Sequence, residues 1–189
     1  MYIECQRNIN KCIMNLKNGK SVIYPTESVF GIGCDPDNEK AIINLLKIKN
    51  RNAKKGLIII SYNYKHIKKY ISTKNVPKNN IKKFYKFWPG NFTLLHPANN
   101  NVSFYIKGNS ELVAVRITKN KFVKSLCKNF GKAIISTSAN LSGLNPCRNM
   151  KEVLYQFGKK ICIMNGYVNL KKSPSTIINI INGEYIRNG

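Results

Sequence analysis

The chain has 189 residues, of which 43% are hydrophobic, so we expect a single globular domain over residues 1–189 that buries a sizeable core. No apolar run reaches the roughly 18 residues of a membrane span, and the first twenty residues lack the pattern of a secretory signal. The six cysteines form no Cys-x-x-Cys pair and the two histidines lie far apart, which excludes the common zinc sites. We therefore expect reduced thiols and a cytoplasmic location.

The net charge of +24 comes from 32 lysines and arginines against 8 aspartates and glutamates. Such an excess attracts polyanions, so affinity for tRNA or double-stranded RNA is one hypothesis. The alternative is compositional drift on a solvated surface. The spread of the lysines along the whole chain, among many asparagines and isoleucines, favours drift.

Helical and strand patterns alternate along the chain, which is typical of the α/β class. One helix begins near Asp37 and Glu39, which we expect to cap it, and ends within residues 47–51. The other helices are expected over residues 8–18, 78–87, 122–127 and 152–157. Strands are expected over residues 21–24, 57–60, 92–96, 112–117, 132–137, 161–164, 173–181 and 184–189, with a loop over 98–110.

Small polar residues lie at the end of the predicted strand over 132–137 and just after it. Ser136, Thr137, Ser138 and Asn140 come directly after an apolar run. Hydroxyl and backbone N–H groups gathered at a strand end can form a concave surface that binds phosphate or carboxylate oxygens. The alternative is an ordinary turn rich in serine and threonine.

Two further places along the chain offer cations to an anionic ligand. Lys49 and Arg51 lie two residues apart, so they converge only if the helix stops between them, and together they would suit a polyphosphate or carboxylate. Solvated surface residues are the alternative. Arg116, near the end of an apolar strand, either lies at an exposed rim or binds an anionic ligand, since an unpaired buried charge is costly.

Taken in chain order, these motifs resemble the YrdC/Sua5 family of L-threonylcarbamoyladenylate synthases, closest to its short, single-domain bacterial form, called TsaC or YrdC. The resemblance covers nearly the whole chain. It implies a twisted mixed sheet with surrounding helices and a large, positive, concave cavity. The matching elements are Pro25-Thr26-Glu27 with Gly31-x-Gly33, Lys49-x-Arg51, Trp88-Pro89-Gly90 with Thr93, Ala114-Val115-Arg116, Ser136-Thr137-Ser138-Ala139-Asn140 with Ser142-Gly143, Ser175-Thr176, and Arg187-x-Gly189.

The resemblance implies a nucleotidyltransferase that forms threonylcarbamoyl-AMP and pyrophosphate from L-threonine, bicarbonate and ATP. This product serves the t6A modification of adenosine 37 in ANN-decoding tRNAs, and downstream proteins of the TsaD, TsaB and TsaE type would transfer the threonylcarbamoyl group. Mg²⁺ would accompany ATP without a dedicated metal site. The alternative function is an RNA-binding module that acts through its basic surface without nucleotide chemistry.

The resemblance also implies roles for ten residues of this chain. The residues expected to be catalytic and to bind ATP are Lys49, Arg51, Ser138 and Asn140. Thr93 and Arg187 are expected to complete the ATP site. The expected threonine contacts are Thr26, Arg116, Ser136 and Ser175. The chain departs from the family pattern at Asn52, where a proline is usual, and at Ile60, near which longer relatives carry a histidine.

Overall fold

The computed structural model describes residues 2–168 and 173–189, except for the side chains of residues 2–7. Nine strands within these residues form one sheet in the order β7-β1-β2-β6-β3-β5-β4-β8-β9. The strands are β1 (Val22–Pro25), β2 (Phe30–Gly33), β3 (Ile58–Ser61), β4 (Phe92–Pro97), β5 (Leu112–Ile117), β6 (Ile134–Ser138), β7 (Cys162–Ile163), β8 (Thr176–Asn179) and β9 (Tyr185–Arg187).

The sheet is mixed, as expected for this α/β fold. The pairs β1–β7, β3–β5 and β4–β8 are parallel, and the other neighbours are antiparallel. Gly33 lies so close to β6 that an added Cβ would sit 1.8 Å from the carbonyl oxygen of Ile135. Only a residue without a Cβ allows the two backbones to approach this closely here.

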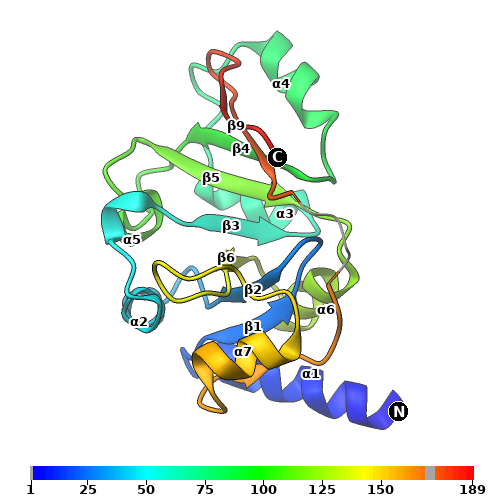
Figure 1. Ribbon diagram of the computed structural model, residues 1–189. Helices are drawn as coiled ribbons and strands as arrows, with labels where there is room; N and C mark the ends of the chain where they lie inside the picture. The colour runs from blue at the N-terminus through cyan, green and yellow to red at the C-terminus, as the bar shows by residue number, and fades with distance from the viewer. Residues whose placement is uncertain (1, 169–172) are drawn as a thin grey trace.

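Helices surround the sheet, with α1 and α7 near its β1 end and α4 near its β8–β9 end (Figure 1). The α-helices are α1 (Tyr2–Lys17), α2 (Glu39–Lys49), α3 (Tyr64–Ile67), α4 (Lys78–Tyr85), α5 (Phe104–Lys107), α6 (Lys121–Phe130) and α7 (Met150–Phe157). The short 3₁₀ segments are η1 (Ala53–Lys55) and η2 (Lys68–Tyr70). None of the described helices is long and apolar enough to cross a membrane.

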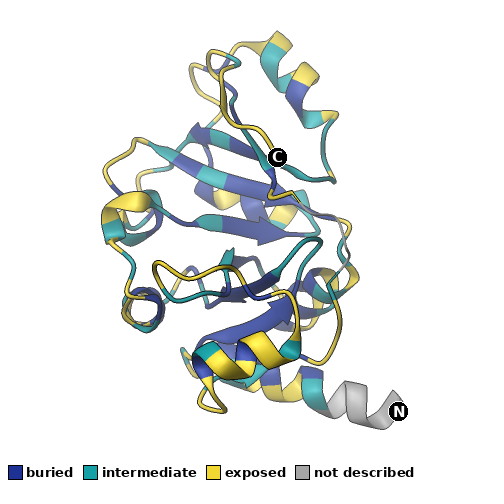
Figure 2. Ribbon diagram, viewed as in Figure 1, coloured by how far each residue is buried: buried dark blue, intermediate teal, exposed yellow. Residues whose placement is uncertain are grey.

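The core follows the alternation of side chains along the strands. Ile59, Val115 and Ile135 point to one face, where they pack with α2 and the α3–η2 segment. Ile134 packs on the other face with α1 and α6. Buried residues accordingly concentrate in the central strands (Figure 2). Because α1 and α6 cover only part of their face, the rest of it remains open to form a cavity.

Several predicted elements need correction. Strand β2 and helix α3 were not predicted, and helix α5 lies within the expected loop over 98–110. Asp37 does not cap α2, because the Asn38 side chain accepts from the backbone N–H of Ala41 in that role. Asp37 instead accepts hydrogen bonds from Tyr70 and Lys69, each at 2.7 Å.

Candidate active site

A cavity of about 610 Å³ opens on the sheet face that α1 and α6 leave uncovered. Alternate residues of neighbouring strands form its floor, among them Ile58 of β3, Ala114 of β5, and Ser136 and Ser138 of β6. The turn between β1 and β2 and the C-terminal strand β9 contribute to its walls. The hydroxyl-rich end of β6 therefore lies inside a concave site.

The cavity is strongly positive. Its basic lining residues, within the described part of the chain, are Arg51, Lys55, Lys107, Arg116, Arg148 and Arg187. Glu27 is the one acidic side chain among the described lining residues. Such a surface attracts anions, and its low-dielectric walls strengthen the field inside it.

Helix α2 ends between the two cations of the Lys-x-Arg motif. Asn50 is the C-cap in the left-handed conformation, with φ 49° and ψ 47°. The expected condition for convergence of Lys49 and Arg51 on one site is thereby met. The two side chains nevertheless have different surroundings. Of the two, Arg51 is among the described residues that line the cavity and Lys49 is not.

Lys49 is buried, with 3% of its surface exposed. Its ammonium donates to the carbonyl oxygens of Ser138 and Asn140, the latter at 2.6 Å. Burial, and then the charge of Arg51, lower the pKa of Lys49 to about 8. The backbone of the Ser-x-Asn motif thus holds the ammonium of Lys49. The contact of Lys49 with ATP phosphates stays a prediction.

Asn140 is half-buried and is not among the described residues that line the cavity. Its amide oxygen accepts from the Ser138 hydroxyl at 2.6 Å, and its amide nitrogen donates to the carbonyl oxygens of Leu141 and Leu144. Asn140 thus fixes the loop after β6, while Ser138 faces the cavity. The structure brings Lys49, Ser138 and Asn140 together, and of these three Ser138 is among the described residues that line the cavity.

Arg51 presents a partly free guanidinium to the cavity. Its Nη2 donates to the carbonyl oxygen of Gly56 at 3.0 Å, whereas its Nε is buried without a hydrogen-bond partner in the described structure. Burial lowers the pKa of Arg51. A buried donor without a partner is costly, so an anion bound here would satisfy it.

Arg116 lines the cavity and is 8% exposed. Its Nη2 lies 2.9 Å from Oε1 of Glu27, and its Nε donates to the carbonyl oxygen of Gly90 at 3.1 Å. Burial lowers the pKa of Arg116, and Glu27 opposes this effect. The sequence left open whether Arg116 is exposed at a rim or bound to an anion. The structure shows a buried arginine whose charge is paired with Glu27.

The remaining expected residues form a second polar group across β4, β8 and β9. The hydroxyls of Thr93 and Ser175 lie 2.8 Å apart, and Nη2 of Arg187 donates to the backbone oxygen of Ser175 at 2.7 Å. Ser175 and Arg187 line the cavity. Thr93 is fully buried and is not one of the described wall residues. Its hydroxyl contact supports Ser175, and its role in the ATP site stays a prediction.

Thr26 lines the cavity from the β1–β2 turn, where its hydroxyl donates to the carbonyl oxygen of Val29 at 2.6 Å.

Sequence reasoning missed Lys55, Lys107 and Arg148 as lining residues. Arg148 lies in the loop before α7, and its backbone N–H donates to the carboxylate of Glu152 at 2.6 Å. No local pattern distinguishes these three from the many other basic residues of the chain.

Metal-binding side chains are not grouped in this site. Within residues 2–168 and 173–189, no three His, Cys, Asp or Glu side chains gather as a potential metal site. The only carboxylate on the described cavity wall, Glu27, is paired with Arg116.

The family model Sua5/YciO/YrdC, described as "Telomere recombination", matches residues 14–189. A protein named threonylcarbamoyl-AMP synthase from Buchnera aphidicola subsp. Schizaphis graminum is 44% identical, over 94% of this chain and 93% of its own length. A protein of the same name from Photorhabdus laumondii is 44% identical, over 92% of each chain.

Two solved structures share the fold. The crystal structure of P. abyssi Sua5 complexed with L-threonine matches with a TM-score of 0.83 and 29% identity, over 90% of this chain and 50% of that one. This chain thus spans about half the length of that protein. E. coli YciO matches with a TM-score of 0.78 and 20% identity, over 97% of this chain and 91% of its own.

Proposed function

The chain belongs to the Sua5/YciO/YrdC family, and from this we infer that it is an enzyme that forms threonylcarbamoyl-AMP and pyrophosphate from L-threonine, bicarbonate and ATP. The names of relatives at 44% identity over most of the chain support this function. The structural observation that carries it is the meeting of Arg51 and Ser138 in one positive cavity. These two residues come from motifs far apart in the sequence.

The reaction brings several anions together. The threonine amine attacks the carbon of bicarbonate, a C–N bond forms, and water leaves to give a carbamate. A carbamate oxygen then attacks the α-phosphorus of ATP, and the bond to pyrophosphate breaks. The protein has to bind and orient these reactants, supply positive charge and exclude water that would hydrolyse the product. A cavity of about 610 Å³ lined by arginines and hydroxyls suits that task.

We assign the phosphates of ATP to Arg51, Arg148 and Arg187, which supply charge from three different segments of the wall. Ser138 supplies a hydroxyl beside them. Mg²⁺ enters as the complex with ATP, whose phosphates it neutralises. Lys49 and Asn140 contribute by holding Ser138 in place, as their hydrogen bonds indicate.

We assign threonine to the part of the cavity near Thr26, Arg116, Ser136 and Ser175. In support, the matching P. abyssi Sua5 structure is a complex of that protein with L-threonine. By this proposal the product serves t6A formation at adenosine 37 of tRNA through separate transfer proteins. We propose the cytoplasm as the compartment, because Cys12, Cys34, Cys127, Cys147 and Cys162 are free thiols.

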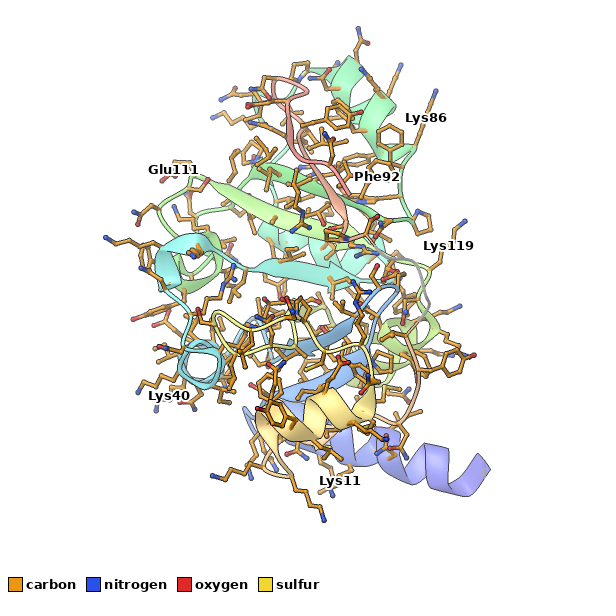
Figure 3. The ribbon with its side chains drawn as sticks, in the orientation of Figure 1. Lys11, Lys40, Lys86, Phe92, Glu111 and Lys119 are labelled. Carbon is orange, nitrogen blue, oxygen red and sulfur yellow. The ribbon has the colours of Figure 1, made fainter. Side chains whose placement is uncertain are left out.

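The RNA-binding module without chemistry is not favoured. The labelled lysines Lys11, Lys40, Lys86 and Lys119 are exposed and project from separate elements in different directions (Figure 3). Among these labelled residues there is no single basic stripe of the kind that follows a nucleic-acid backbone. RNA affinity of the enzyme remains a separate proposal.

The test is a turnover assay with purified protein. Pyrophosphate should appear only when ATP, L-threonine and bicarbonate are all present, and mass spectrometry should detect threonylcarbamoyl-AMP. Pyrophosphate release that continues without threonine or bicarbonate would contradict the proposed reaction.

A further inference from the structure

Glu27 is chemically unlike the other charged groups that face the cavity. It follows Thr26 in the β1–β2 turn, and its carboxylate shares the described wall with six basic side chains. A site for anions alone gains nothing from a carboxylate, because like charges repel and lower affinity for phosphate. Pairing with Arg116 accounts for one of its oxygens, and the other is the candidate acceptor for a positively charged ligand group.

One carboxylate oxygen of Glu27 is held firmly. Oε1 lies 2.9 Å from Nη2 of Arg116 and accepts a hydrogen bond from the hydroxyl of Thr118. Thr118 is itself fixed, because its backbone N–H donates to the carbonyl oxygen of Ser61 at 2.9 Å. These contacts set the orientation of the carboxylate and satisfy its first oxygen.

The second oxygen lacks a partner among the described residues, and 22% of the Glu27 side chain is exposed. Oε2 of Glu27 is buried and has no hydrogen-bond partner in the described structure. A buried carboxylate oxygen without a donor is costly. A donor supplied by a ligand would remove that cost and would gain from the negative charge.

We propose that Oε2 of Glu27 accepts a hydrogen bond from the α-ammonium group of the amino-acid substrate. The inference deepens the proposed function and rests on it. An amino acid is a zwitterion, so a cavity that carries only cations would bind its carboxylate and repel its ammonium. Glu27 supplies the missing acceptor beside Thr26, and its pairing with Arg116 limits the net charge at that point. The site thereby binds an amino acid more tightly than the analogue that lacks the amino group.

The test compares two ligands that differ only in the amino group, L-threonine and 3-hydroxybutyrate of matching stereochemistry. Calorimetric titration of the wild-type protein should show tighter binding of L-threonine. Glu27→Gln keeps the side-chain length but removes the charge. It should weaken L-threonine binding about 10- to 100-fold, as expected for the loss of a charged hydrogen bond, while affinities for 3-hydroxybutyrate and ATP change little.

Thr118→Val serves as the matched control, because it removes the donor to Oε1 and leaves the charge of Glu27 in place. If Glu27 served only to position Arg116, Glu27→Gln would weaken both ligands alike. Thr118→Val loosens the carboxylate but keeps its charge, so it should weaken L-threonine binding much less than Glu27→Gln does. Equal weakening of both ligands by Glu27→Gln would overturn the inference. Equal affinity of the wild-type protein for the two ligands would also overturn the inference, and this result does not depend on whether the variant folds. A wild-type protein that binds no L-threonine would instead contradict the proposed function.

Discussion

The ammonium of Lys49 lies 2.6 Å from the carbonyl oxygen of Asn140. A second hydrogen bond joins the same two segments, because the backbone N–H of Ser142 donates to the carbonyl oxygen of Lys49 at 3.0 Å. The end of α2 and the loop after β6 are thus bonded to each other through both side chain and backbone. Since Arg51 follows Lys49 and Ser138 precedes Asn140, these bonds fix the relative position of the two residues that face the cavity.

The first prediction concerns that contact. Lys49→Met should lower kcat for pyrophosphate release at least about tenfold and cost about 1–3 kcal/mol in the free energy of unfolding, because it leaves buried carbonyl oxygens without a donor. Lys47→Met is the control, since Lys47 is an exposed lysine of the same helical turn, and it should change stability by less than about 0.5 kcal/mol. Denaturant unfolding and the turnover assay measure both. Equal effects of the two variants would contradict the structural role of Lys49.

The second prediction concerns Arg51. Arg51→Gln should raise KM for ATP about 10- to 100-fold, because the guanidinium is the side chain of the Lys-x-Arg motif that reaches the cavity. Arg51→Lys should recover only part of the affinity, since lysine keeps the charge but loses the forked donors. The control is Lys54→Gln, at an exposed position of η1, which should leave KM for ATP unchanged. An unaltered KM in Arg51→Gln would place the phosphates elsewhere.

Sequence patterns located most of the sheet because its central strands are apolar runs bounded by turn residues. The expected strand over 112–117 has the bounds of β5. Strand β2 escaped prediction because it is short and two of its four residues are glycine, a residue depleted in strands. Its place depends on pairing with β1 and β6, which is a tertiary effect. Helices α3 and α5 have four residues each, too few for a periodic signal.

Sequence motifs located most residues of the candidate site but not the direction of their side chains. A motif identifies residues that lie near one another, but it does not say which side chain faces the cavity. Ser138 and Arg51 do so, whereas Lys49 and Thr93 point into protein and bind its polar groups. That choice is made by packing around each backbone position. Arg148 had no signal because a lone arginine in a loop resembles any other basic residue of this chain.

The third prediction concerns Gln156 of α7. Its Oε1 accepts from the backbone N–H of Leu141 and its Nε2 donates to the carbonyl oxygen of Asn145, both at 2.9 Å. The side chain therefore closes the loop that follows Ser138. Gln156→Leu should lower kcat several-fold and speed amide hydrogen exchange at Leu141, while the free energy of unfolding falls by about 1–2 kcal/mol.

Two further variants test this assignment. Gln156→Glu keeps the acceptor for Leu141 and loses the donor to Asn145, so exchange at Leu141 should stay close to that of the wild-type protein. Tyr155→Ala changes the neighbouring residue of α7, which is 87% exposed, and should leave exchange and kcat unaltered. If exchange at Leu141 were equally fast in all three variants, general loosening of α7 would be the cause.

The fourth prediction is a pH dependence of stability. His96 is fully buried in β4, and its ring stacks on Trp88 at 5.9 Å between centroids. Burial lowers the pKa of His96 from 6.5 to about 4. Between these values the unfolded chain binds a proton that the folded protein does not. The free energy of unfolding should therefore fall as pH decreases from 6.5 toward 4, by about 3 kcal/mol from this residue.

His96→Phe isolates that contribution, because it keeps a ring against Trp88 and removes the titrating group. Carboxylates titrate in both proteins, so the informative quantity is the difference in unfolding free energy between wild type and variant, measured by urea titration at about pH 7 and about pH 4.5. We expect the variant to gain about 2–3 kcal/mol relative to wild type at the lower pH. Any change in packing is the same at both pH values and cancels. A difference that does not vary with pH would mean that His96 takes up its proton at the same pH in the folded and unfolded states.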